Sequence, residues 1–192
     1  MSNPPTDFYS QDRWQNWIDR LDDEEIDPDD EDSARLLLNL QDDTAIAIAK
    51  IVAAYEDEEL GAEDALDEIA EVREIVLSPV EIDDEETLML IDGVQTSLVC
   101  VFFAAEEYVA NGPADDAAVD EYLRAAADAE AEEDLDAALG YAAQAGTLIF
   151  AGEEIDVSIA EDLEYGLVTE WINGLDSLQS AMSDPEVVEE DE

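Results

Sequence analysis

Residues 84–110, DEETLMLIDGVQTSLVCVFFAAEEYVA, decide the fold class, because their apolar side chains recur at helical spacing over many turns. One face of the expected helix collects Leu88, Ile91, Leu98, Val99, Phe102 and Val109. Asp83, with Glu86 three residues later, predicts a start of the capping-box type. Asn111-Gly112-Pro113 predicts the end. This helix is long enough to be the central element on which the other helices pack.

The rest of the chain shows the same helical periodicity, and no segment alternates apolar and polar residues as a half-buried strand would. Ser10 is expected to cap a first helix that ends at the acidic connector 22–32. The other expected helices cover residues 33–55, 62–77, 113–130, 135–151 and 158–182. The sequence therefore predicts an all-α, bundle-like domain of about seven helices. It should have a long central helix and a C-terminal helical hairpin followed by a last helix.

A single domain is expected, because the Asn-Gly-Pro joint is the only clear seam in a chain of 192 residues. We assign residues 1–9 to an N-terminal arm and residues 10–182 to the all-α domain, with a softer seam at 111–113. Residues 183–192 are assigned to a disordered acidic tail. One cooperative helical unit with a softer C-terminal half is therefore the expected organisation.

The formal charge of the chain is −50, from 56 acidic and only 6 basic residues, yet 47% of its residues are hydrophobic. High charge with low hydrophobicity indicates disorder, but this chain has enough apolar residues for a core. So much charge of one sign destabilises a compact state by self-repulsion. The Debye length falls from about 8 Å at physiological salt to about 3 Å at 1 M, so molar salt removes most of that repulsion. The composition therefore predicts a protein from an organism with molar salt in its cytoplasm.

The scarcity of basic residues also excludes classes of partner. Nucleic-acid binding needs clustered Lys and Arg, and anionic membrane surfaces attract the same side chains, so neither partner is expected. The chain has no stretch of roughly 18 uncharged apolar residues, so no membrane-spanning helix is expected. The first residues, MSNPPTDFYS, lack the basic and apolar parts of a signal peptide. A cytoplasmic location is therefore expected.

Three stretches in the N-terminal half of the chain resemble a known protein family: DFYSQDRWQNWIDRL, DEDSARLLLNLQDDTAIAIA and DGVQTSLVCVFFAAEEYV. They are similar to a family of uncharacterised conserved proteins from haloarchaea and related archaea, over most of residues 7–110. The resemblance implies an archaeal origin and a cytoplasmic protein. It implies no catalytic residue, because it brings no assigned activity with it.

The chain has no histidine, which removes the commonest general base and the commonest transition-metal ligand. Phosphate-binding glycine loops and dinucleotide fingerprints are also missing. Cys100, the only cysteine, lies within the apolar run LVCVFF and is interpreted as a buried hydrophobic side chain instead of a nucleophile. No catalytic residue, metal or cofactor is therefore expected, although an enzymatic role stays open as an alternative.

One set of acidic residues gives that alternative. Glu130 and Glu133 are followed by Glu153 and Asp156, a pattern similar to the magnesium-binding signature of all-helical nucleoside-triphosphate pyrophosphohydrolases. Helical i,i+3 spacing places each pair on one face, where the carboxylates could hold a hard cation. Chance can supply such a pattern in so acidic a chain. Arg124 is also the only basic residue after position 73 that could help to bind a triphosphate.

Two further groups of residues are singled out by their surroundings. Trp14 and Trp17 lie on the short first helix and are interpreted as core residues, with partner binding as the alternative because tryptophan is enriched at interfaces. Lys50 and Arg73 have apolar neighbours at i±3 and i±4, so each should form an ion pair with a carboxylate on another helix. Glu106 is the expected partner of Arg73, because it shares the apolar face of the central helix.

The sequence therefore predicts a salt-adapted, cytoplasmic helical protein that is not an enzyme and acts through contact with a protein partner. The partner is not identified, and a homo-oligomer stays open as a form of that contact. The alternative is a divalent-metal-dependent phosphohydrolase that uses the four carboxylates named above.

The charge balance gives a prediction about salt. Helical circular dichroism should be strong in molar KCl and largely lost in dilute buffer, because electrostatic screening weakens sharply between these conditions. A salt titration of the dichroism signal and of the melting temperature measures this effect. Full helicity with an unchanged melting temperature in dilute buffer would defeat the salt-adapted interpretation.

Overall fold

The computed structural model describes residues 9–24, 26–27 and 29–183, and within them the chain forms eight α-helices. In chain order these are α1 (Gln11–Asp23), α2 (Glu31–Glu56), α3 (Ala62–Val76), α4 (Glu85–Asn111), α5 (Val119–Ala131), α6 (Leu135–Phe150), α7 (Ile159–Asp162) and α8 (Leu167–Ser183). No strand occurs among the described residues, so the predicted all-α fold is confirmed. The predicted arm and tail fall mainly at residues 1–8 and 184–192, outside the described part of the chain.

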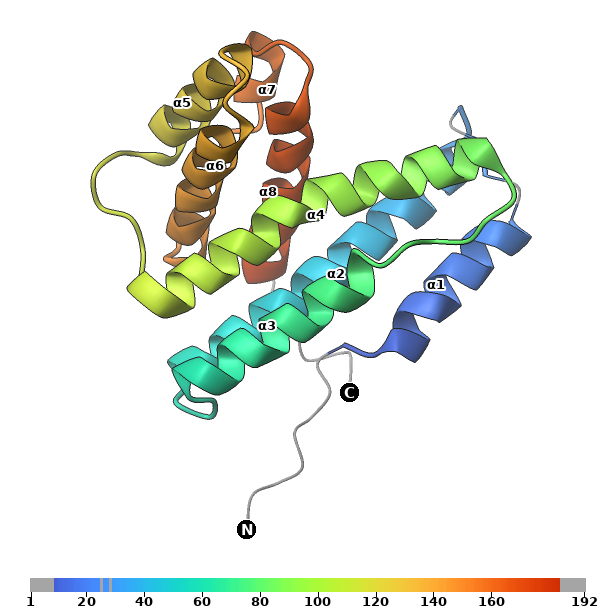
Figure 1. Cartoon of the computed structure of the whole chain (residues 1–192), viewed down its shortest axis with the longest axis horizontal. Coiled ribbons are helices and arrows are strands. Elements are labelled where there is room, and N and C mark those ends of the chain that lie inside the picture. The colour runs from blue at the N-terminus through green and yellow to red at the C-terminus, as the bar shows by residue number, and fades with distance from the viewer. Residues whose placement is uncertain (1–8, 25, 28, 184–192) are drawn as a thin grey trace.

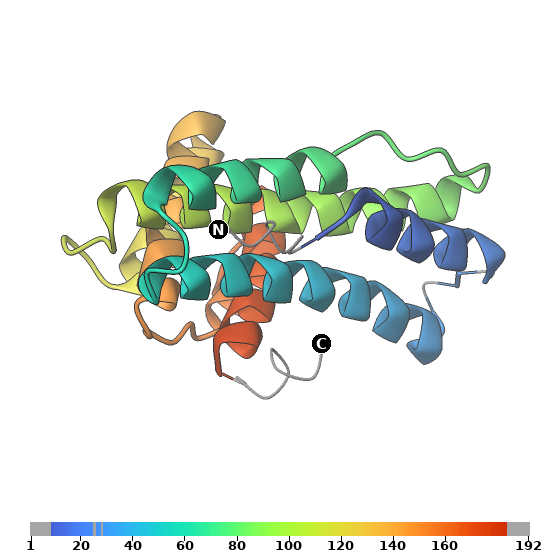
Figure 2. The same cartoon turned by 90° about the horizontal axis from the view of Figure 1, so that it is seen from below.

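Helix α4 is the central element, as its length predicted. It packs against α2, α3, α6 and α8. Figure 1 shows α2 and α3 running beside it, while α5 to α8 gather over its C-terminal half. Figure 2 shows α1 at one end of the molecule, between the levels of α2 and α3. The side of α4 that faces these helices is fully buried at Ile91, Leu98, Val101 and Phe102.

By length and composition alone, α4 could also cross a membrane, a property not expected from the sequence. Its most apolar window has a mean hydropathy of 1.8, and half of that window is buried inside the protein. The core helix of a soluble protein meets the same criteria. Packing on four other helices accounts for the apolar character of α4.

Two glycines bring other helices close to the backbone of α4. A Cβ atom at Gly146 of α6 would overlap the side chain of Ala104, and a Cβ atom at Gly174 of α8 would overlap the carbonyl group of Ser97. Both α4 residues are buried. Because glycine has no side chain, α6 and α8 approach α4 more closely at these points than any other residue would allow.

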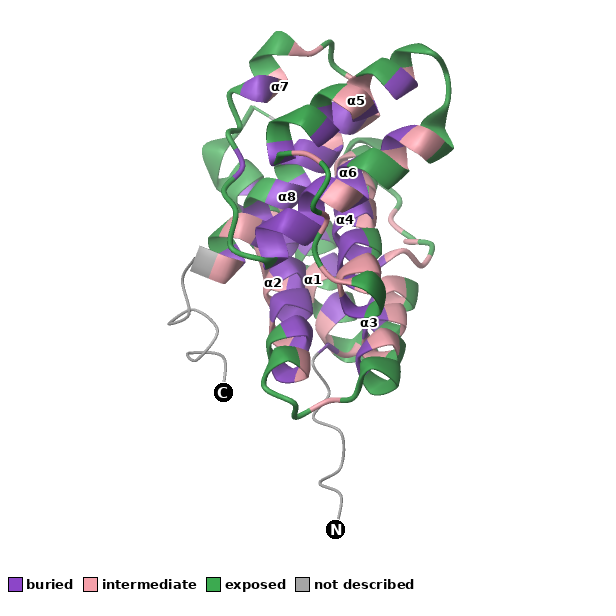
Figure 3. Cartoon of the chain, turned by 90° about the vertical axis from the view of Figure 1, so that its left-hand side faces the viewer, coloured by how far each residue is buried: buried purple, intermediate pink, exposed green. Residues whose placement is uncertain are grey.

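A buried hydrogen-bond network joins three helices where α8 crosses α2 and α4. Gln41 of α2 donates through Nε2 to the Asn173 carbonyl oxygen at 3.0 Å and to Ser177 Oγ at 2.8 Å. Ser97 of α4 donates to Gln41 Oε1 at 3.1 Å. Figure 3 shows buried residues on the facing sides of these three helices. The Gln41 amide is thus hydrogen-bonded at both its oxygen and its nitrogen, as a buried polar group must be to avoid a large desolvation cost.

Polar side chains cap the N-termini of α1 and α4, and a glycine ends α4. Ser10 Oγ accepts the N–H of Arg13 at 3.1 Å, which confirms the predicted cap of the first helix. The cap of α4 is Asp84, one residue later than predicted, because its carboxylate accepts the N–H of Thr87 at 3.1 Å. At the other end, α4 stops as predicted at Gly112, which has a φ of 81°.

Helix α5 begins at Val119, so the predicted start at residue 113 was wrong. The N–H of Ala114 donates to Thr147 Oγ1 of α6 at 3.1 Å, which holds this segment against another helix. The Glu121 carboxylate accepts the N–H of Ala118 at 2.9 Å, and this contact stabilises the observed start. Residues 113–118 therefore form a connection between two helices.

The last predicted helix, residues 158–182, is interrupted, and the structure divides it into α7 and α8. The Glu130 carboxylate of α5 accepts the N–H groups of Leu167 at 2.8 Å and of Val168 at 3.0 Å. It therefore satisfies two free donors in the first turn of α8 and places a negative charge at the helix N-terminus. Gly166 permits this approach, because a Cβ atom there would overlap the same carboxylate.

Replacing Gly174 with alanine should destabilise the protein by about 1–3 kcal/mol, the usual cost of overpacking, although alanine is the better helix former by about 1 kcal/mol. The matched control is Gly140→Ala in α6, an exposed position where a Cβ atom would meet nothing within 4 Å. In thermal melts in molar KCl, the control should raise the melting temperature and Gly174→Ala should lower it. If both substitutions raised the melting temperature, this would contradict the close packing of α8 on α4 at Gly174.

Candidate interaction surface

The carboxylates of the alternative metal site do not form one site. Glu130 uses both of its carboxylate oxygens to cap α8. Asp156 Oδ1 accepts the N–H of Ser158 at 3.0 Å and its hydroxyl at 2.6 Å, and these bonds lower the pKa of Asp156 below its usual value. Glu133 and Glu153 are exposed just beyond the ends of α5 and α6. Among the residues that the structure describes, no group of three or more acidic or cysteine side chains could hold a metal ion.

The structure brings together Arg73 of α3 and Glu106 of α4 as an ion pair, the contact expected from the sequence. Their side chains are 32% and 23% exposed. Burial raises the pKa of Glu106 above its ordinary value, and the charge of Arg73 partly offsets this effect. The Arg73 guanidinium also lies 5.8 Å from the ring centroid of Phe103. Lys50, the other cation singled out, lies half-buried on α2.

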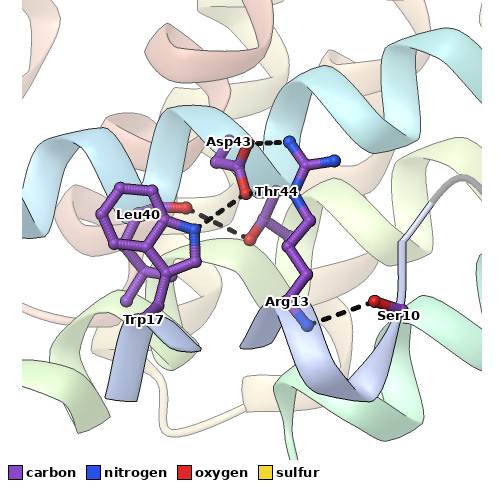
Figure 4. A network of polar contacts seen from close by, with 6 residues as sticks. All are labelled: Ser10, Arg13, Trp17, Leu40, Asp43 and Thr44. Atoms are coloured by element: carbon purple, nitrogen blue, oxygen red, sulfur yellow. Dashed lines mark hydrogen bonds and ion pairs between the residues drawn. The ribbon is translucent and has the colours of Figure 1, made fainter. Parts of the chain in front are cut away.

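The two N-terminal tryptophans pack inward, and Figure 4 shows the polar contacts around the second of them. Trp14 is 3% exposed, so its indole ring is inaccessible to a partner in this structure. Trp17 is half-buried and donates through Nε1 to Asp43 Oδ2 of α2 at 2.9 Å. Arg13 binds the same carboxylate, through Nε at 2.8 Å and also through Nη2. Asp43 thus joins α1 to α2, a contact between residues too far apart in sequence to share a local pattern.

A different surface lies on α4. The N-terminal half of this helix extends beyond α5 to α8, and one side of it faces no other helix in Figure 1. We call the solvent-accessible side the α4 face, and it consists of Met89, Asp92, Thr96, Val99 and Phe103. Met89 is 74% exposed and Phe103 is 39% exposed. Asp92 is the only charged residue of α4 on this side between Met89 and Phe103, and Glu85 and Glu107 continue the same side one turn beyond either end.

A groove borders the α4 face. It has a volume of about 530 Å³ and lies between residues 77–80 of the α3–α4 connection and four residues of α4, Leu88, Met89, Asp92 and Gln95. Gln95 Nε2 donates to the carbonyl oxygens of Val76 at 2.8 Å and of Ser78 at 3.1 Å, so it fixes the connection beside α4. Asp92 is again the only charged residue in the lining, and most of the others are apolar.

The α4 face could not be separated from the core side by periodicity, because α4 is apolar around most of its circumference. The available sequence signal was Gly93, a glycine inside a long predicted helix. A Cβ atom at Gly93 would meet nothing within 4 Å, so this glycine differs from the two that pack against α4 from other helices.

The fold and this surface together define an acidic, all-helical protein whose central helix exposes apolar side chains on one side. A family model described as an uncharacterised protein conserved in archaea (DUF2150) matches residues 7–191. The chain therefore belongs to this archaeal family, which confirms the resemblance seen in the sequence and extends it over residues 111–191. No curated protein and no solved structure matches the chain.

Removing the cation of the α3–α4 ion pair should destabilise the fold. Arg73→Ala should lower the free energy of unfolding by more than an exposed helical ion pair contributes, which is about 0.3–0.5 kcal/mol. It should cost less than the roughly 3–5 kcal/mol measured when a fully buried pair is broken from one side. Arg124→Ala, at an exposed position of α5, is the control. Unfolding curves of both variants in molar KCl measure the difference, and equally small effects would show that Arg73 acts as an ordinary surface charge.

Lower pH should reduce the loss of stability that the Arg73→Ala substitution causes. Without Arg73, nothing from that side chain offsets the desolvation of Glu106, so the pKa of Glu106 rises further. A carboxyl group with a higher pKa in the folded than in the unfolded state destabilises the fold when it is ionised. That cost disappears as pH falls through the folded-state pKa. The gap in melting temperature between wild type and variant should therefore narrow in mildly acidic buffer, and a constant gap would rule out this cause.

Proposed function

We propose that the protein acts by protein–protein contact through the α4 face and its bordering groove, in the salt-rich cytoplasm of an archaeon. One observation carries the proposal: large apolar side chains, above all Met89, are exposed on a stretch of α4 in which Asp92 is the only charged residue between positions 89 and 103 on that side. Exposed apolar patches mark sites of interaction. Methionine is well suited to such a site, because its flexible side chain adapts to the shape of a partner.

Salt favours contact through an apolar surface. The 56 acidic and 6 basic residues support a salt-rich environment, and at 1 M salt the Debye length is about 3 Å. Attraction between charged patches is strongly screened under these conditions. Burial of apolar area does not depend on unscreened charge, so the α4 face is the part of this surface best suited to hold a partner.

The two alternatives receive less support from the contacts of their residues. A cation bound by the four carboxylates would have to compete for Glu130 with the first turn of α8, and for Asp156 with Ser158. Partner binding by the tryptophans would require Trp14 to leave the core, where it is 3% exposed. We therefore place the contact surface on α4 and assign no catalytic role to the carboxylates.

Thiol chemistry gives a direct test of this surface. The native Cys100 is fully buried, and burial raises the pKa of its thiol, so it should not react with a maleimide. Met89→Cys can therefore be labelled alone with benzophenone maleimide and irradiated in an extract of archaeal cells that contain this protein, in molar KCl. Leu38→Cys, on α2 and 52% exposed in the native chain, is the matched control.

Position 89 should give discrete cross-linked adducts with a protein, and position 38 should not. The same adducts from both positions would show that contact is unspecific. An absence of adducts from position 89, with labelling complete, would overturn the proposed function.

A further inference from the structure

We propose that Asn111-Gly112, at the C-terminal end of α4, is a modification site at which the folded protein loses the side-chain amide of Asn111 by spontaneous deamidation. The inference does not depend on the proposed function, since the site lies at the other end of α4 from Met89 and needs no partner. Only two asparagines of the chain, Asn111 and Asn173, precede a glycine. The structure places these two dipeptides in different surroundings, and this difference carries the inference.

The reaction needs only the asparagine side chain, the next backbone nitrogen and water. The backbone nitrogen of Gly112 attacks Cγ of Asn111, and the new C–N bond closes a succinimide ring. The side-chain nitrogen leaves as ammonia and takes the proton of the Gly112 N–H with it. Water then opens the ring at one of its two carbonyl groups, which gives aspartate or, where the chain continues through Cγ, isoaspartate. Glycine favours ring closure, because it has no Cβ atom to hinder the approach of its nitrogen.

Asn111 is the last residue of α4, and Figure 1 shows the connection that follows it as a loop at the edge of the molecule. Its exposed side chain donates through Nδ2 to Glu107 Oε1 at 2.9 Å. The Gly112 N–H donates to the Tyr108 carbonyl oxygen at 2.8 Å. Both bonds must break before the ring can close, and both lie in the last turn of a helix, where opening takes little free energy. A Cβ atom at Gly112 would meet nothing within 4 Å, so no other helix packs on this glycine.

The second dipeptide, Asn173-Gly174, lies inside α8 and serves as an internal control. The Asn173 side chain is also exposed, so the two sites differ in their backbones and not in the access of water to the amide. A Cβ atom at Gly174 would overlap the carbonyl group of Ser97 on α4. The Asn173 carbonyl oxygen accepts a hydrogen bond from Gln41 Nε2 at 3.0 Å. Ring closure there requires α8 to open away from α2 and α4, so the fold protects Asn173 and leaves Asn111 reactive.

Deamidation alters the joint between α4 and α5 in charge and in length. Either acid replaces the donor that Asn111 offers to Glu107 with a second negative charge, four residues away on the same side of the helix. That charge lies at the C-terminal end of α4, where the helix dipole disfavours it. Isoaspartate also adds one atom to the backbone. The longer backbone displaces the segment in which the Ala114 N–H donates to Thr147 Oγ1 of α6 at 3.1 Å.

Peptide mapping by mass spectrometry of the full chain, aged in mildly alkaline molar KCl, tests the site. Trypsin separates the two dipeptides, since the fragment 74–124 has Asn111 as its only asparagine and the fragment 125–192 has Asn173. The mass increase of amide-to-acid conversion should accumulate in the first fragment more than about tenfold faster than in the second. A factor of ten corresponds to only about 1.4 kcal/mol of additional opening free energy.

Two controls assign the reaction. Asn111→Gln should abolish the mass increase in the fragment 74–124, which shows that Gln95 is not its source. In guanidinium chloride, where the fold is lost, both wild-type fragments should react at similar rates, because both contain Asn-Gly. Similar rates in the folded protein would overturn the proposal. So would an Asn111 that stays intact in the folded protein while it reacts in the denatured chain.

Hydrogen exchange measures the effect on the joint. In the aged protein, the amides of residues 114–118 should exchange faster than in fresh protein, and those of the Asn111→Gln variant should keep the same rates through the same incubation. Unchanged exchange in a fully deamidated sample would show that the connection between α4 and α5 does not depend on the contacts of Asn111.

Discussion

Close contact at two glycines sets the spacing of the helices around α4. Gly146 holds α6 against Ala104, and Gly174 holds α8 against Ser97, both on the same central helix. The other long neighbours of α4, α2 and α3, pack on its remaining buried sides. A side chain at either glycine would move its helix outward, and a side chain at Gly174 would also lengthen the hydrogen bonds that Gln41 makes to α8. The backbone separation at α4 therefore controls both the apolar packing and the buried polar network.

Helix α4 thus packs in the core on one side and is exposed to solvent on another. The apolar character of α4 comes from its four packed neighbours, and the α4 face keeps that character where no helix covers it. The ion pair of Arg73 and Glu106 lies at the edge of this face, next to Phe103. A cation above the aromatic ring limits the positions that the ring can take. The ion pair therefore helps to order the aromatic side chain at one end of the α4 face.

Local sequence patterns were sufficient wherever the cause of a structure is local. The cap at Ser10 and the end at Gly112 follow from residues within one turn of the helix ends, and Arg73 and Glu106 were paired because both lie on apolar faces. The interruption before α8 could not be predicted, because Glu130 lies 37 positions before Leu167. The α4 face was missed for a related reason, since only the packing of other helices decides which side of an apolar helix stays exposed.

The hydrogen bonds of Gln41 have a consequence for the order in which a newly made chain can fold. Gln41 and Ser177 are separated by 136 positions, so α2 leaves the ribosome long before α8 has been synthesised. Chains begin to fold from their N-terminal side as they emerge. Until α8 arrives, Gln41 Nε2 lacks both of its acceptors on α8 and has only water to bind. The first four helices can therefore gather only provisionally during translation, and the last helix to be made closes the structure around them.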